Sequence, residues 1–366
     1  MGNLRGKLLP PALAIVFSML LCGVALVISG ANPLSAFGAM VTQVGKGTTL
    51  VDIINSTGIY YIAALAVAIG FQMNLFNIGV EGQYRLAGFA AGAFAGQAWL
   101  PGSLNTVVAV VVAMVTGALW AGLAGILRTS RGVSEVISTI MLNAIAGSLI
   151  GYLISRIGVN NGNATNTRTI PEGSHVGMIT IFSDSPTKLY GLSFLAIVVG
   201  VVFWVLLNRT RFGFDLRAAG ASESAAVASG VSVKRMIVIS MLLSGAVAGL
   251  VGLPVMFSDS YNYGSSFQTG LGFTGIAVAL LGRNHPVGIA FSALIFAFLS
   301  EQATLLNILA GVSPDIVVVT QGVIVMAVVI AYEVVRRYGA RLEQTQVAAQ
   351  LSRRARTVPE TEGVAP

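Results

Sequence analysis

The sequence predicts an all-α integral membrane protein with about ten transmembrane helices. Of its 366 residues, 55% are hydrophobic and 10% are charged, whereas roughly a quarter of the residues in a soluble domain carry charge. Many apolar runs approach about 20 residues, the length that an α-helix needs to cross a bilayer. The net charge of +7 does not indicate nucleic-acid binding, because the cations stand at the ends of these runs.

Ten apolar runs are long enough to serve as spans in the lipid bilayer. They cover 12–30, 50–70, 84–100, 105–127, 133–155, 189–207, 236–257, 267–283, 286–305 and 315–335. An even number of spans places both termini on one side of the membrane. Residues 1–338 are therefore expected to form one polytopic domain. The remaining residues, 339–366, are charged and rich in Gln and Ala, and we expect a disordered or loosely helical tail.

The distribution of Lys and Arg orients these spans. With the N-terminus in the cytoplasm, 17 of the 21 Lys and Arg residues fall on the inner side. The cations left on the outer side are Lys46, Arg156, Arg168 and Lys188. Because loops on the cytoplasmic side carry an excess of Lys and Arg, we expect a multi-pass protein of the cell membrane with cytoplasmic N- and C-termini.

A soluble-looking segment, residues 208–236, separates the sixth and seventh spans. Ser222 is suited to cap a short helix, Glu223 places an acid in its first turn, and Gly230 is a natural stop. A helix of about two turns is not stable alone in water, so we expect it to dock against a cytoplasmic partner. The small side chains expected on its docking face are Ala225, Ala226 and Ala228.

On the opposite side, the long polar loop 158–188 is expected to pack over the outer mouth or to bind an extracytoplasmic partner. A flexible spacer is the alternative interpretation. Within the membrane, glycines recur every four residues, a spacing that permits close helix contacts. These are Gly88, Gly92 and Gly96 in the third span, and Gly245 and Gly249 in the seventh.

No motif in the chain predicts an enzyme. The lysine of Gly45-Lys46-Gly47 lacks both the upstream glycine and the following Ser or Thr of a P-loop, so we expect no ATPase site. The GxGxxG match at 270–275 follows no predicted strand, and small-residue helix packing accounts for it. His175 and His285 stand apart in the sequence and show no metal-ligand spacing. We expect a transport subunit that binds no cofactor or metal itself.

Polar residues at membrane depth are the candidate substrate pathway, because burying them there is costly and they usually face a cavity or another helix. Glu135, Thr139 and Asn143 recur every four residues and share one face of the fifth span. Hydrogen bonding between helices is the alternative role for that face.

The second group of polar residues, Asn77, Glu81 and Gln83, lies between two spans beside glycines that would interrupt a helix. Broken helices mark binding or gating regions in transporters, and a plain cytoplasmic turn is the alternative. Residues 76–79 and 267–270 both end in glycine before a glycine-rich span, and these two spans run in opposite directions. The match indicates an inverted repeat.

Four motifs, in order, resemble one known family. They are MNLFNIGVEGQ at 73–83, SEVISTIMLN at 134–143, RAAGASESAAVASGV at 217–231 and GFTGIAVALLGRNHPVG at 272–288. Together with the rest of 13–335, they resemble permeases of bacterial ABC importers, in the simple-sugar and nucleoside branch. Within that branch, the chain is similar to the larger of the two nucleoside permeases.

This resemblance implies a transmembrane permease subunit that moves nucleosides into the cell. Its implied partners are a cytoplasmic ABC ATPase that uses ATP and Mg, a second related permease, and an extracytoplasmic substrate-binding lipoprotein. Residues 217–231 correspond to the coupling helix of the family, with Ser222 where Asn is usual. The implied ATPase-coupling residues are Arg217, Gly220, Glu223, Ala225, Ala226 and Gly230.

Other functions remain open at this point. A simple sugar such as ribose is the alternative substrate, and the pore could pair two copies of this chain instead of two related permeases. An ion-coupled secondary transporter would work without an ATPase. A membrane-embedded enzyme or receptor would need a catalytic or signalling set of residues that we do not find, and the permease-type motifs disfavour an ABC exporter.

Overall fold

The computed structural model describes residues 47–161, 164–183 and 185–310, with scattered positions in 20–42 and 319–326. Every helix and strand named below lies within the unit Leu34–Val318. Most of the first and tenth expected spans and the whole tail 339–366 lie outside the described residues. The number of ten spans therefore stays a prediction.

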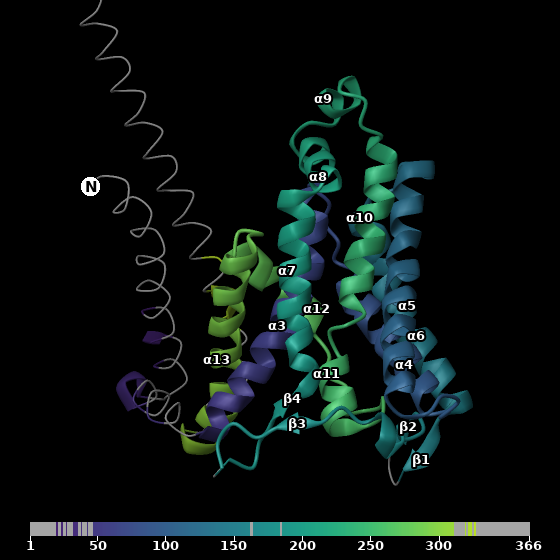
Figure 1. Ribbon diagram of the computed structural model, residues 1–366. Helices are drawn as coiled ribbons and strands as arrows, with labels where there is room; N and C mark the ends of the chain where they lie inside the picture. The colour runs from purple at the N-terminus through teal and green to yellow at the C-terminus, as the bar shows by residue number, and fades with distance from the viewer. Residues whose placement is uncertain are drawn as a thin grey trace, which may run out of the picture. The chain divides into compact units, whose positions relative to one another are not determined.

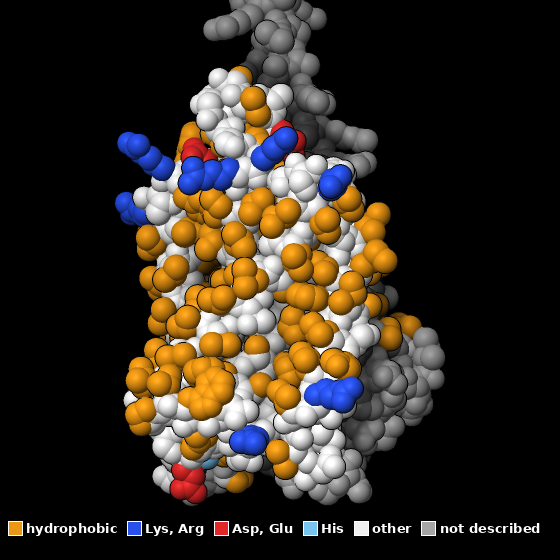
Figure 2. Space-filling model, turned by 90° about the vertical axis from the view of Figure 1, so that its right-hand side faces the viewer, with side chains coloured by type: hydrophobic (Ala, Val, Ile, Leu, Met, Phe, Trp, Pro, Cys, Tyr) orange, Lys and Arg blue, Asp and Glu red, His pale blue; other side chains and the backbone are white. Residues whose placement is uncertain are grey.

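The second to ninth expected spans all correspond to helices (Figure 1). These are α3 (Gly47–Gln72), α4 (Val80–Ala95), α5 (Gly102–Arg131), α6 (Glu135–Ile157), α7 (Phe194–Arg209), α10 (Val233–Ala248), α12 (Leu271–Leu281) and α13 (Pro286–Ala310). Among the described residues, five helical stretches are long and apolar enough to cross a membrane. Figure 2 shows a broad apolar surface with Lys and Arg gathered toward the two ends. The fold is that of an all-α integral membrane protein.

The bundle has two distinct ends (Figure 1). One end carries the short helices α8 (Arg211–Ala221) and α9 (Glu223–Ala228), and we call it the α9 end. The other, the β-strand end, carries two antiparallel hairpins. Their strands are β1 (Val159–Asn161), β2 (Ala164–Asn166), β3 (Met178–Ile179) and β4 (Leu189–Tyr190), and the 3₁₀ turns Glu172–Ser174 and Gly191–Ser193 lie beside them.

The loop 158–188 packs against the chain that follows α10. The backbone N–H groups of Thr167 and Ile170 donate to the carbonyl oxygens of Tyr263 and Tyr261, both at 2.8 Å. The ring of His175 stacks on that of Tyr261. The loop therefore packs against one end of the bundle, and its expected position over the outer mouth stays a prediction.

Helix α3 forms the centre of the fold. It contacts α7, α10, α12 and α13, and the residues from Ala63 to Ala68 are fully buried. The helices α5, α6 and α7 instead expose large apolar side chains such as Val111, Leu119 and Ile140. A lipid-facing or partner-facing surface accounts for this exposure, because large apolar patches on proteins mark membrane or protein contacts.

The expected seventh span, 236–257, is not one continuous helix. Helix α10 ends at Ala248, a turn follows, and the chain resumes as α11 (Leu253–Val255) and a π-helical turn (Met256–Ser260). Pro254 at the start of α11 has no N–H to continue the α10 ladder. The glycine before it, Gly252, lies so close to the ring of Phe267 that a Cβ would overlap the ring. The break therefore makes room for the segment that leads to α12.

The glycine repeats admit two different neighbours. Gly245 and Gly249 of α10 face the backbone of α5 at Gly117 and Ala113, so the expected close helix contact is confirmed. Gly88 and Gly92 of the α4 repeat instead face the chain after α10: a Cβ at Gly88 would meet Phe267, and one at Gly92 would meet Tyr263 and Met256. The repeat of Gly88 and Gly92 therefore accommodates the aromatic segment that contains Tyr263 and Phe267 and runs along α4.

The contact between α5 and α10 should depend on Gly245. A Cβ added there would overlap the carbonyl oxygen of Gly117, so Gly245→Ala should lower the free energy of unfolding by roughly 1–3 kcal/mol. Thermal unfolding in detergent measures the effect. Gly147→Ala is the matched control, since nothing lies within 4 Å of a Cβ at that position on α6. Equal unfolding temperatures for the two variants would contradict this packing.

Candidate functional site

Two short helices begin at one point inside the bundle. Helix α4 has 16 residues and α12 has 11, so at 1.5 Å per residue neither reaches the ~30 Å of a hydrocarbon core. Gly272 lies against the backbone of Glu81 so closely that a Cβ would overlap it. From this junction α4 runs to the β-strand end, where Gly96 contacts Arg168, and α12 runs toward the α9 end.

The carboxylate of Glu81 joins the two helix starts. Its Oε1 accepts the N–H of Gly270 at 2.8 Å, and its Oε2 accepts the N–H of Gly272 at 3.0 Å. Glu81 also lies in the first turn of α4. Helix N-termini carry partial positive charge and unpaired N–H groups, so one carboxylate stabilises both starts. The sequence indicated a broken helix at 76–83 but not this contact with residues 270–272.

The junction lies near half the depth of the membrane. The turn after α12 contacts the end of α3, because the Gln72 amide donates to the carbonyl oxygen of Asn284 at 3.1 Å. Between this turn and the junction stand the 11 residues of α12, about 16 Å of helix. The length of α12 is thus about half the thickness of a hydrocarbon core of ~30 Å.

Asn77 and Gln83 form a closed hydrogen-bonded network beside the junction. The Asn77 amide donates to Gln83 Oε1 at 3.1 Å and to Ser244 Oγ at 2.8 Å, and Gln83 donates back to Asn77 at 2.9 Å. Ser244 in turn donates to the carbonyl oxygen of Ala66 at 2.6 Å. Both amides are 1% exposed, so in this conformation they hold α3, α4 and α10 together.

The expected polar face of α6 holds the link between α3 and α4. Asn143 accepts the N–H of Gly82 at 2.8 Å and donates to the carbonyl oxygen of Ile78 at 3.0 Å. Thr139 is fully buried and donates to the carbonyl oxygen of Glu135 in its own helix at 2.7 Å. The alternative role, hydrogen bonding between elements, therefore describes the contacts of Asn143, whose side chain is partly exposed.

Arg85 of α4 was counted with the cytoplasmic cations, and its contacts place it elsewhere. It lies about one turn beyond Glu81 toward the β-strand end, near Tyr263. Its side chain is partly exposed, but its Nε is buried and has no hydrogen-bond partner in the described part of the chain. No carboxylate in the described part of the chain is within ion-pair distance of it. An Arg at this depth normally faces a cavity or the interior of a bundle.

Non-helical chain with exposed polar side chains adjoins Arg85. Ser265, Ser266, Gln268 and Thr269 are all exposed and directly precede the N-terminus of α12. Tyr84 fixes this segment by donating its hydroxyl to the carbonyl oxygen of Gln268 at 2.9 Å. Irregular backbone at membrane depth is tolerated only where protein covers it or water reaches it. Sequence analysis placed these residues at the edge of a span and missed them.

The short helix expected at 223–230 is present as α9. Its cap is as expected, with Ser222 Oγ accepting the N–H of Ala225 at 3.3 Å, and Gly230 ends it with a positive φ of 84°. The expected face of small side chains is wrong in one respect: Ala225 is exposed, but Ala226 is 2% exposed and faces its own chain. The large apolar residue that α9 exposes is Val227, at 62%.

Helix α8, which sequence analysis did not anticipate, carries the other two coupling candidates. Gly220 packs against the end of α3, where a Cβ would overlap the carbonyl oxygen of Gln72. Arg217 donates to the carbonyl oxygen of Leu207 at the end of α7. These contacts attach the α8–α9 segment to the transmembrane helices.

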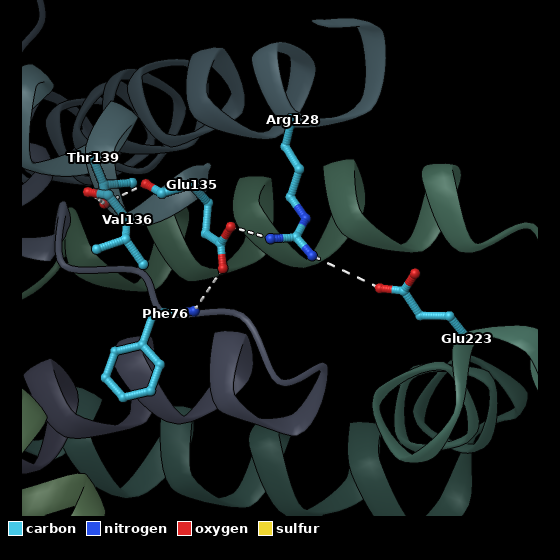
Figure 3. Close-up of polar contacts among 6 residues, drawn as sticks. All are labelled: Phe76, Arg128, Glu135, Val136, Thr139 and Glu223. Atoms are coloured by element: carbon cyan, nitrogen blue, oxygen red, sulfur yellow. Dashed lines mark hydrogen bonds and ion pairs between the residues drawn. The ribbon is translucent and has the colours of Figure 1, made fainter. Parts of the chain in front are cut away.

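A charged cluster connects α9 to α6 (Figure 3). Arg128, in the last turn of α5, pairs through Nη1 with Glu135 at the start of α6. Its Nη2 lies 3.7 Å from Glu223 Oε1 on α9. The other oxygen of Glu135 accepts the N–H of Phe76 at 3.4 Å.

Carboxylates also gather at the β-strand end, around Tyr190. Burial, followed by the negative charges of Asp259, Asp52 and Glu301, raises the pKa of Tyr190 to about 12. The phenol, which is protonated at neutral pH even with an ordinary pKa, therefore stays protonated into more alkaline solution.

These features define the class of protein: a polytopic α-helical membrane protein with broken helices at membrane depth and a helical projection at one end, as transport subunits have. The chain belongs to the family of permease components of branched-chain amino acid transport systems, whose match covers residues 49–331.

Curated relatives extend this family assignment over nearly the whole chain. The chain is 32% identical to the nucleoside ABC transporter permease protein NupB of Lactococcus lactis over 91% of its length and 93% of the relative. It is 32% identical to the guanosine ABC transporter permease protein NupP of Bacillus subtilis, covering 89% and 94%. It is 27% identical to NupC, a second nucleoside permease protein of L. lactis, covering 65% and 76%.

The junction should depend on the Glu81 carboxylate. Glu81→Gln replaces an anion that accepts two backbone N–H groups by a neutral amide with one acceptor oxygen, so we expect a loss of roughly 1–3 kcal/mol in unfolding free energy. Thermal unfolding of the purified protein tests this, with the exposed Glu172→Gln as control. A Glu81→Gln variant as stable as its control would show that the two N–H groups find other partners.

Proposed function

We propose that this chain is the permease subunit of an ATP-driven ABC importer that carries nucleosides into the cell. The observation that supports this most directly is the similarity to two permeases named for nucleoside and guanosine transport, each covered over more than 90% of its length. The broken helices at membrane depth fit a solute pathway.

The ATPase that drives transport would dock on α9. This helix projects from one end of the bundle (Figure 1) and exposes Val227 together with the carboxylate of Glu223. Because Ala226 faces inward, a partner would contact Ala225, Val227 and Glu223 and leave Ala226 to support the helix from within. ATP and Mg would bind to that partner. The α9 end would then face the cytoplasm, in agreement with the positive-inside distribution of Lys and Arg.

Two further partners complete the proposed importer. Both NupB and NupC of L. lactis are similar to this chain, which supports a pore formed by this permease and a second, related one. The β-strand end would face outward and receive a substrate-binding lipoprotein. Its hairpins and the Tyr190 cluster provide ordered backbone and hydrogen-bonding groups for such a contact.

Uptake by intact cells tests the proposed substrate. Cells that lack the gene should lose ATP-dependent uptake of radiolabelled guanosine, adenosine or uridine, and the intact gene should restore it. Ribose is measured in parallel, and ATP-depleted cells serve as the control. If the cells lost only ribose uptake, the result would indicate that the substrate is a sugar. Uptake that survives ATP depletion would indicate an ion-coupled transporter.

Within this importer, the solute would pass Arg85 and the exposed polar segment 265–269. The residues first expected to line the path, Asn77, Gln83 and Asn143, are engaged with each other or with backbone. The Arg85 side chain is instead partly exposed, although its unpaired Nε is buried. Its N–H donors suit the carbonyl oxygens of a base or the hydroxyl oxygens of a ribose.

Arg85→Gln should therefore slow nucleoside uptake about tenfold or more, which corresponds to one lost hydrogen bond to a charged donor. The amount of protein in the membrane should not change, as immunoblots would verify. Arg156→Gln, which alters an exposed Arg stacked on Tyr152 at the end of α6, is the control. Uptake at the control rate in the Arg85 variant would exclude Arg85 from the path.

A further inference from the structure

The turn between α5 and α6 brings three elements together at one guanidinium group. Arg128 comes from the last turn of α5, Glu135 begins α6, and Glu223 begins α9. Figure 3 shows the guanidinium between the two carboxylates. Glu223 is 88 positions beyond Glu135 in the sequence, so the tertiary fold creates this cluster.

The two ion pairs of Arg128 differ in strength. The side chain of Glu135 is 8% exposed, and it pairs closely with Arg128, which is 29% exposed. Glu223 is 64% exposed and its nearest oxygen is 3.7 Å away. Salt and competing groups weaken an exposed, long pair far more than a buried one. A protein docked on α9 is therefore able to draw Glu223 away while Arg128 stays with Glu135.

The cluster continues from Glu135 into the link between α3 and α4. Its second oxygen accepts the N–H of Phe76, and Asn143, two turns further along α6, bonds Ile78 of the same link and Gly82 in the first turn of α4. This link leads into the first turn of α4, where Glu81 lies. A shift at the start of α6 is thereby carried to the junction through a few directly bonded residues.

We propose that Arg128 is the positioning residue that transmits the movement of α9 to the junction of α4 and α12. With Glu223 in place, Arg128 holds the start of α6 against α9. When the ATPase displaces α9, the contact between Arg128 and Glu223 lengthens. Arg128 then shifts together with its partner Glu135, and this shift reaches Phe76 and α4. This inference rests on the proposed docking of the ATPase on α9.

The test uses the complete importer, reconstituted in liposomes with its ATPase, second permease and binding protein. The measured quantity is the number of nucleoside molecules transported per ATP hydrolysed. Arg128→Gln should lower this ratio by roughly fivefold or more, the lower end of typical coupling between sites. Arg131→Gln, which alters an exposed Arg one turn later in α5, should leave it unchanged.

A double-mutant cycle identifies the partner of Arg128. Glu223→Gln alone should also lower the ratio, and the double variant should lower it no further than Arg128→Gln alone, because both remove the same contact. An unchanged ratio in Arg128→Gln, or additive effects in the double variant, would overturn the proposal. The proposal would also be overturned if Arg128→Gln reduced ATP hydrolysis and transport together and lowered the unfolding temperature. That result would show that Arg128 has a structural role only.

Val227→Asp separates this proposal from the docking on which it rests. It places a charge on the large exposed apolar residue of α9, one helical turn beyond Glu223, and should release the ATPase during purification. If the ATPase stays bound and coupled, docking on α9 is wrong and the role of Arg128 fails with it. If Val227→Asp releases the ATPase while Arg128→Gln keeps both the ATPase and the full transport ratio, the docking stands and the transmission through Arg128 is wrong.

Discussion

The fold depends on a carboxylate that lies where two helices begin inside the membrane. A helix start leaves unpaired N–H groups and a partial positive charge, and water is not available there to satisfy them. Two helix starts placed together would leave two sets of unpaired N–H groups and would bring two partial positive charges close to each other. Glu81 solves both problems, because it belongs to the first turn of α4 and accepts the N–H groups of Gly270 and Gly272 before and within α12. The shortness of both helices follows from this shared starting point.

The same constraint explains several other polar residues in the bundle. The link between α3 and α4 and the segment before α12 are not helical, so their backbone groups need partners. Asn77 and Asn143 supply them for the link, and Tyr84 and Thr167 supply them for the segment. Polar side chains at membrane depth therefore have two roles here. Those that bond backbone support the broken helices, and Arg85 with the exposed residues 265–269 would meet the solute in the proposed pathway.

Much of the helical architecture could be predicted from the sequence, because it depends on local properties. Apolar length located the eight helices that correspond to the second to ninth spans, and Ser222 and Gly230 delimited α9. What failed depends on distant contacts. Arg85 was assigned to the cytoplasm because a cation near the end of an apolar run usually lies there, and only the approach of Tyr263 to α4 shows otherwise. Ala226 was placed on an exposed face because a six-residue helix has no periodicity that reveals which side is covered.

The candidate site was predictable in part for the same reason. Residues 76–83 were recognised as a broken helix from their glycines and polar groups, and the likeness between 76–79 and 267–270 identified the two stretches that precede α4 and α12. Nothing in the sequence indicated that these helix starts touch, since 189 positions separate Glu81 from Gly270. The contact of Arg128 with Glu223 was hidden in the same way, because neither residue lies in a motif that specifies its partner.

Two independent contacts lead from the α8–α9 segment to the same link between α3 and α4. Gly220 of α8 lies against Gln72 and Met73, where α3 ends, and the Arg128–Glu135 pair reaches Phe76 three residues later. A continuous helix would pass a displacement along its whole length, whereas a non-helical link is able to change its backbone angles locally. Asn74, with a positive φ of 57°, lies between these two contacts. The link is therefore the place where a movement of α9 would change the direction of α4 without disturbing the buried centre of α3.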